Sequence, residues 1–244
     1  MAKVEQYQDK LHSVEDWDEY LLKESGLPGP RGNIELAQAV AREGNREVFM
    51  RYRAYTADIA PINSPYEFLA FCGTLGLGRL LAEGDTDQLE ALRTQASDPR
   101  WRVREGVAMA LQLLGDEDMG ILVDAMQSWS LGNFLEQRAA AAALCEPRLL
   151  HAEQYARRTL DILDTITSSL EGSEERHGAA FIALRKGLGY CWSVAVAALP
   201  QEGKPLMEKW LANMDRDIQW IMRENLKKNR LVRMDPAWVE QWRK

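Results

Sequence analysis

At 244 residues, the chain is long enough to form one large domain or two small ones with a sizeable core. Apolar residues make up 46% of it and charged residues 27%, as in ordinary soluble globular proteins. The formal net charge of −7 and the pI of about 5.2 argue against capture of nucleic acid by a generally basic surface. They leave room only for a local basic strip.

Residues 1–32 differ in composition from the remainder and are expected to be an acidic N-terminal extension and linker. The extension carries the run Glu15-Asp16-Trp17-Asp18-Glu19 and one short helix that ends near Glu24. The glycine- and proline-rich run 26–32 follows and reads as a turn-rich linker. We find no apolar signal-peptide core and no apolar run of the ~20 residues that a membrane span requires. The sequence therefore predicts a cytoplasmic protein that does not associate with membranes.

Residues 33–244 are dense in helix signals, and strand signals are nearly absent. Asn33 is a helix cap with a stop at Gly44, and Ser64-Pro65 is a strong helix start in which Glu67 can complete a capping box. Asp98-Pro99 and Asp235-Pro236 combine an acidic cap with a proline. These boundaries divide the segment into helix pairs. The expected pairs are 88–96 with 101–114, 120–129 with 134–144, 149–170 with 176–199, and 206–214 with 218–229. Flanking helix pairs at 33–57 and 66–82 fit by pattern only.

One helical motif recurs along these pairs. The segments 98–107 and 217–226 share the spacing Asp-x-x-Trp-x-x-Arg-Glu-x-apolar, and 133–141 keeps the apolar positions and the arginine. In the first copy, Val103, Val107 and Leu111 fall on the stripe of a helix that is buried on one side. Because each unit alone leaves that stripe exposed to water, stacking on neighbouring units is expected to stabilise it.

The first copy, Asp98-Pro-Arg-Trp-Arg-Val-Arg-Glu-Gly-Val-Ala-Met-Ala-Leu, resembles the second-helix signature of HEAT repeats. The resemblance implies an all-α fold, a right-handed α-α superhelix (solenoid) of about five HEAT-like helix pairs spanning 33–244. It also implies that the aspartate caps the helix and that the arginine connects neighbouring repeats. The architecture serves many functions, so it decides the fold rather than the activity.

The function favoured by the sequence is a non-catalytic scaffold that binds a protein or peptide partner on its concave face. The candidate partner-binding residues are Trp101, Arg104, Trp220 and Arg223. No catalytic residue, cofactor or metal site is predicted, since the three histidines are scattered and no HxxxH or CxxC spacing occurs. The glycines of 73–78 are expected to permit close helix packing rather than to hold a phosphate.

The alternative is a DNA-binding or base-excising protein. Arg100, Arg102 and Arg104 surround Trp101, and five cations follow Trp220, a pattern that can hold phosphates and stack bases. Those five cations are Arg223, Lys227, Lys228, Arg230 and Arg233. In residue type, Trp101, Trp220 and Asp98 are similar to the tryptophans and aspartate of HEAT-like alkylpurine DNA glycosylases.

Two further interpretations stay open. In one, the tryptophans fill gaps between repeats while the arginines pair with acidic residues of the next repeat. The chain also resembles HEAT-like bilin lyases through the repeat, which implies a possible role as a partner subunit of an enzyme.

Overall fold

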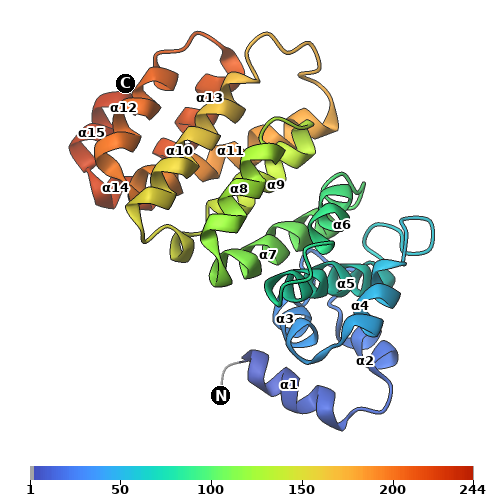
Figure 1. Ribbon diagram of the computed structural model, residues 1–244. Coiled ribbons are helices and arrows are strands. Elements are labelled where there is room, and N and C mark those ends of the chain that lie inside the picture. Colours follow the sequence, from blue (N-terminus) through green and yellow to red (C-terminus); the bar gives the residue numbers. More distant parts are fainter. Residues whose placement is uncertain (1–2, 244) are drawn as a thin grey trace. The chain divides into compact units, whose positions relative to one another are not determined.

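The computed structural model describes residues 3–243, and within them the chain forms fifteen α-helices, one 3-10 helix and no β-strand (Figure 1). The all-α class expected from the sequence is confirmed. The helices form two compact units, of which the first ends at Glu117 and the second begins at Asp118. The sequence predicted a boundary between an extension, 1–32, and a repeat domain, 33–244. That boundary stays a prediction, and it differs from the division between the two compact units.

A central helix organises the first unit. α5 contacts five other helices of the unit, and most of its residues are buried, so it is apolar on all sides rather than amphipathic. The two helices of the N-terminal extension belong to this unit, because α1 packs on α3 and α2 packs on α5. The helices of the unit are α1 (Lys3–Ser13), α2 (Trp17–Glu24), α3 (Ile34–Glu43), α4 (Arg46–Arg53), α5 (Pro65–Ala82), α6 (Gln88–Gln95) and α7 (Trp101–Glu117).

Glycines let α5 approach its neighbours closely. A Cβ atom at Gly73 would lie 2.4 Å from the backbone nitrogen of Arg53 on α4, and one at Gly78 would lie 2.4 Å from Cα of Ala110 on α7. No side chain fits at these distances. The glycine run 73–78 thus serves helix packing, as expected, and is not a phosphate loop.

Several predicted helix boundaries are confirmed by their caps. The Ser64 hydroxyl accepts a hydrogen bond from the Glu67 N–H, and the Asn33 side chain accepts one from the Leu36 N–H. Asp235 accepts from the Trp238 N–H at the start of the last helix. These short-range contacts fix where the helices begin, whatever packs against them later.

The second unit stacks helix pairs, as an α-solenoid does. α8, α10 and α12 contact one another in series, α9, α11 and α13 do the same, and each helix of the first row pairs with its sequence neighbour in the second row. Its elements are α8 (Met119–Trp129), α9 (Phe134–Leu144), the 3-10 helix η1 (Pro147–Leu149), α10 (Glu153–Ser168), α11 (Ala179–Ala198), α12 (Pro200–Leu211), α13 (Arg216–Leu226), α14 (Asn229–Met234) and α15 (Pro236–Arg243).

Two predicted helices of this unit have different bounds. The helix expected at 206–214 begins at Pro200 and contains Pro205, because the carbonyl that loses its partner belongs to the exposed Gln201 and can bind water instead. The helix expected at 218–229 ends at Leu226, and the extended backbone of Lys228 starts the separate helix α14. This break lies at Lys227 and Lys228, directly before the basic residues Arg230 and Arg233.

The close contact of α5 with α7 makes a testable prediction. Gly78→Ala should destabilise the first unit by about 1–3 kcal/mol, because the added methyl group overlaps the backbone of Ala110. The change would otherwise favour the helix by about 1 kcal/mol, since alanine is the better helix former. Urea unfolding followed by circular dichroism measures the difference.

Gly106→Ala is the matched control on α7. Its Cβ would lie 3.0 Å from the Phe71 ring. Because a ring can shift where a backbone cannot, this change should destabilise the unit less than Gly78→Ala does. Equal midpoints for the Gly78→Ala variant and the wild type would contradict the close approach of the two helices.

Candidate functional site: an apolar patch and a basic pocket

The first copy of the motif sits at the start of α7, and its arginines are bound within the protein. Arg100 is 2% exposed and Arg102 is 5% exposed, whereas the Trp101 side chain between them is 42% exposed. The side chains of Arg100 and Arg102 therefore point into the protein, and the side chain of Trp101 points toward the solvent.

Arg100 ties a long loop to the start of α7. Its guanidinium donates to both carboxylate oxygens of Asp98, at 2.9 and 2.8 Å, and to the backbone carbonyls of Tyr55 and Ala60 at 2.8 and 3.2 Å. The Asp98 carboxylate also accepts from the Arg100 N–H at 2.8 Å. A buried guanidinium whose donors are paired in this way fixes the loop that runs from α4 to α5.

Arg102 ties a second loop to the same place. It pairs with the fully buried Glu67 at 2.9 Å and donates to the carbonyl of Gly29 at 2.7 Å. Glu67 also accepts from the Asn63 N–H at 2.7 Å. The capping box predicted at Ser64 is therefore only half formed, because the Ser64 N–H donates to the Pro61 carbonyl instead of to Glu67. The Arg102 guanidinium also stacks on the Trp101 ring at 4.5 Å and holds the exposed indole in place.

Arg104, a candidate partner-binding residue, contacts its own helix start. Its guanidinium donates to the carbonyls of Asp98 and Pro99 at 2.5 and 2.9 Å. These are local contacts within five or six residues. Of the arginines around Trp101, Arg100 and Arg102 form the long-range contacts expected from the interpretation that the arginines pair within the protein.

An apolar patch lies around Trp101. Asn63, which Arg102 contacts, follows the 59% exposed Ile62. Tyr66 is the second residue of α5, and its ring is stacked on Tyr55 at 5.9 Å. We call Ile59, Ile62, Tyr66 and Trp101 the apolar patch; their side chains are 42% to 60% exposed. Of these four residues, only Trp101 was predicted from the sequence. The two isoleucines lie in a loop without helical periodicity, and this could have indicated that their side chains are exposed.

The second copy of the motif lies in the second unit and is built differently. Trp220 is half-buried on α13, where it lies against Gly189 of α11 and stacks under the Arg185 guanidinium at 4.3 Å. The helix cap is Asp215, not the motif residue Asp217, which pairs instead with Arg176 and Arg185. Although the spacing of the motif is the same in both copies, the helix of the second copy is capped by an aspartate outside the motif.

Arg223 is exposed and lines a small cavity of about 270 Å³ with Trp242 and Arg243. Trp101 and Arg104 belong to the first unit, and Trp220 and Arg223 to the second, so each pair is described on its own. Their joint role as one partner-binding face stays a prediction.

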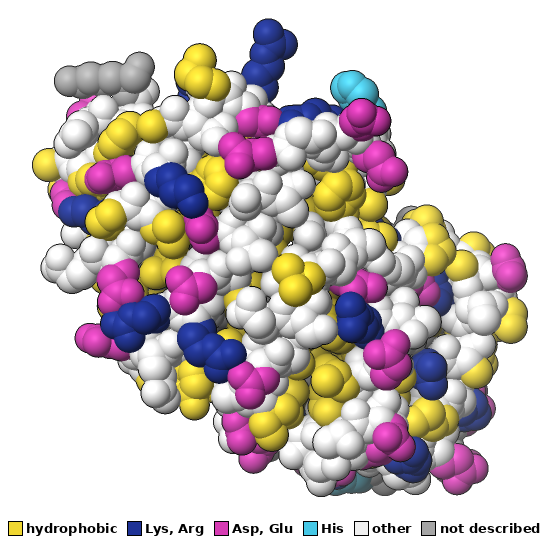
Figure 2. All heavy atoms as spheres, turned by 45° about the horizontal axis from the view of Figure 1, so that its top comes forward, with side chains coloured by type: hydrophobic (Ala, Val, Ile, Leu, Met, Phe, Trp, Pro, Cys, Tyr) yellow, Lys and Arg dark blue, Asp and Glu magenta, His cyan; other side chains and the backbone are white. Residues whose placement is uncertain are grey.

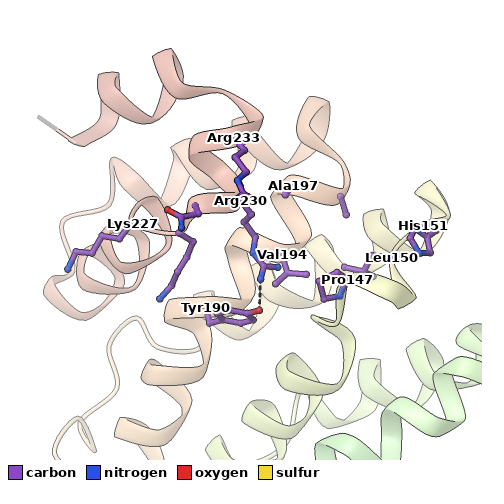
Figure 3. A pocket seen from close by; sticks show the side chains of 12 residues that line it. Pro147, Leu150, His151, Tyr190, Val194, Ala197, Lys227, Arg230 and Arg233 are labelled. Atoms are coloured by element: carbon purple, nitrogen blue, oxygen red, sulfur yellow. Dashed lines mark hydrogen bonds between the residues drawn. The ribbon is translucent and has the colours of Figure 1, made fainter. Parts of the chain in front are cut away.

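A basic pocket of about 810 Å³ opens in the second unit, between the end of α11, η1 and α14 (Figure 3). Four cations line it, Arg230 and Arg233 from α14 and Lys227 and Lys228 from the break before it. The remaining lining is aromatic, imidazole, amide or apolar. Besides the four cations, the lining includes Tyr190, His151, Leu150, Val194 and Ala197.

Tyr190 anchors the cations of this pocket. The Arg230 guanidinium lies 4.7 Å from the centre of the Tyr190 ring and donates a hydrogen bond to its hydroxyl, as Figure 3 shows. The Lys228 ammonium lies 5.9 Å from the same ring. Lys227 pairs with Glu224, but among residues 3–243 no carboxylate forms an ion pair with Lys228, Arg230 or Arg233. The sequence pattern identified these cations as a possible group. It did not identify Tyr190, because the cations that contact its ring lie about 40 residues away in the sequence.

Two of the buried cysteines are poorly suited to act as catalytic nucleophiles. Burial raises the pKa of the Cys72 and Cys145 thiols, and a buried thiol of raised pKa is a poor nucleophile. No group of three histidine, cysteine or acidic side chains within residues 3–243 is placed to hold a metal ion. None of the helices between Lys3 and Arg243 is both long and apolar enough to cross a lipid bilayer.

The buried ion pair gives a prediction for the first unit. Arg102→Met should destabilise it by about 3–5 kcal/mol, because Glu67 is then left as a buried charge without its partner. The double variant Arg102→Met/Glu67→Gln should recover part of the loss, since neither charge remains. Denaturant unfolding of the wild type, the two single variants and the double variant measures this coupling, and a double variant as unstable as the sum of the single changes would contradict it.

Arg176 gives a pH-dependent prediction for the second unit. Hydrogen bonds from Arg176 hold the pKa of Asp215 below its ordinary value, while burial acts in the opposite direction. Arg176→Gln should therefore cost about 1–3 kcal/mol at neutral pH. A carboxyl of lowered pKa stabilises the fold above its unfolded pKa of about 4 and loses this effect as the pH falls.

The stability difference between wild type and Arg176→Gln should thus shrink below about pH 4. Thermal melts between pH 3 and 7 would show it. Arg216→Gln, a change at an exposed arginine beside the same cap, is the control and should leave the difference small at every pH. A constant gap for Arg176→Gln across the pH range would contradict the assignment.

Comparison with known proteins adds little to this geometry. No family model matches the chain, and no curated protein matches it. Among solved structures, the crystal structure of an engineered protein is similar at 16% sequence identity and a TM-score of 0.36, over 99% of this chain and 98% of that one. This likeness is too weak to assign a fold or a function.

Proposed function

We propose that this protein is a non-catalytic helical-repeat module of HEAT type that binds a protein or peptide partner. The observation that carries the proposal is the apolar patch. Large apolar side chains are exposed on the loop before α5, at the start of α5 and at the start of α7, and Arg100 and Arg102 bind this loop to the start of α7; such a group of exposed apolar side chains marks an interaction surface. Tryptophan and tyrosine are also the residues that most often dominate binding energy at interfaces.

The patch is preorganised, which favours binding. Arg100 and Arg102 hold the loop carrying Ile59 and Ile62 against α7, and Arg102 stacks on Trp101. A partner would therefore meet side chains that are already ordered, and less conformational entropy is lost on association. Among the four candidate residues, Trp101 is the one that this argument supports most directly.

The patch gives a prediction for partner binding. Trp101→Ala and Ile62→Asp should each weaken binding of a captured partner about tenfold or more, because a central anchor of an interface typically contributes 2 kcal/mol or more. Affinity capture with the wild-type chain, followed by titration of the purified partner against each variant, measures the effect.

Met214→Asp is the control, since Met214 is 86% exposed but lies far along the chain in the second unit. It should leave the affinity within about twofold of wild type. A partner that binds Trp101→Ala and Ile62→Asp as tightly as wild type would contradict the role of the patch.

A second candidate function is DNA binding or base excision of the alkylpurine glycosylase type. It is favoured by one observation, the half-exposed Tyr190 ring with Lys228 and Arg230 against it. Against it, Arg100 and Arg102 are internal, and on the face shown in Figure 2 lysine and arginine are interspersed with acidic side chains. Fluorescence anisotropy with normal and alkylated duplexes across a salt series tests it. Lesion-selective, salt-sensitive binding would favour this function.

A further inference from the structure

The basic pocket is lined by both charged and apolar side chains. Its cations come from a single short stretch of chain, 227–233, while Leu150, just after η1, and Val194 and Ala197 of α11 supply apolar surface. Figure 3 shows Lys227 on one side of the pocket and Pro147, Leu150 and His151 on the other. Its volume of about 810 Å³ is that of a site for a ligand with several groups and far exceeds the need of one small anion.

The charge of this pocket is local. The second unit, 118–244, has 17 lysines and arginines and 17 acidic residues, so its formal net charge is zero. The first unit has 13 and 20 and thus accounts for the whole net charge of −7. A long polyanion needs a continuous basic track, whereas a short acidic segment needs only a few adjacent cations.

We infer that the basic pocket binds a short acidic segment of a partner protein in which carboxylate side chains alternate with apolar ones. This inference rests on the proposed function, because it names the chemistry of a partner. The carboxylates contact Arg230, Arg233 and Lys228, which lack acidic partners among residues 3–243, and the apolar side chains cover Leu150 and Val194.

Tyr190 prepares the pocket for this ligand. Its ring and hydroxyl hold the Arg230 guanidinium in one orientation. A guanidinium that is already ordered loses less side-chain entropy when a carboxylate binds it, and its remaining N–H groups form a fork that fits two carboxylate oxygens. A partner carboxylate at this site would therefore be bound with defined geometry.

The test uses the full chain and a fluorescein-labelled eight-residue peptide of alternating glutamate and leucine. Three probes accompany it: the same peptide with glutamine in place of glutamate, an oligoglutamate of equal charge, and a single-stranded oligothymidine of equal charge. We expect the glutamate–leucine peptide to bind most tightly in fluorescence anisotropy, and its binding to weaken as salt rises.

Variants locate the site. Arg230→Gln/Arg233→Gln should weaken binding of the glutamate–leucine peptide about tenfold or more. Arg216→Gln removes an exposed cation of the same unit outside the pocket and should change it less than twofold. Circular dichroism melts confirm that the variants are folded, and Arg230→Lys/Arg233→Lys, which keeps both charges, should retain most of the affinity.

Three results would overturn the inference. The glutamine peptide binding as tightly as the glutamate peptide would remove the role of charge, and tighter binding of the oligothymidine would assign the pocket to nucleic acid. Unchanged affinity in the double glutamine variant would place the peptide elsewhere. Failure of the two proposals is distinguishable, because Trp101→Ala should impair partner capture through the patch and leave the peptide affinity unchanged.

Discussion

The Arg102–Glu67 ion pair is the interaction on which the arrangement around the apolar patch of the first unit depends. Glu67 is fully buried, so its charge is tolerated only with a partner, and Arg102 is the partner that reaches it. The same guanidinium contacts the loops at Gly29 and Asn63 and stacks on Trp101. One buried pair therefore sets a helix start, two loops and the orientation of an exposed indole.

The two units achieve their exposed chemistry in different ways. In the first, arginines face inward and leave apolar side chains at the surface. In the second, the break between α13 and α14 brings cations together at the surface, and Tyr190 orders one of them. The same residue types, arginine and an aromatic ring, thus provide internal support in one unit and an exposed basic pocket in the other.

Local signals in the sequence predicted local structure well. Caps such as Ser64 and Asn33 were readable because the partner of each lies three residues away. The roles of the motif arginines were not readable, since Arg102 finds Glu67 across 35 residues and Arg185 finds Trp220 across the same number. The second copy illustrates the limit, because an aspartate two residues before the motif took the cap and freed Asp217 for ion pairs.

The unequal charge of the two units has a consequence for association kinetics. At a distance, an acidic ligand experiences the net charge of −7 and is repelled, while the lysines and arginines that line the pocket attract it. The repulsion extends over about 30 Å at 0.01 M salt but only about 8 Å at physiological ionic strength. Moderate salt therefore speeds the arrival of the ligand even as it shortens its stay, so the on-rate and the residence time respond to salt in opposite directions.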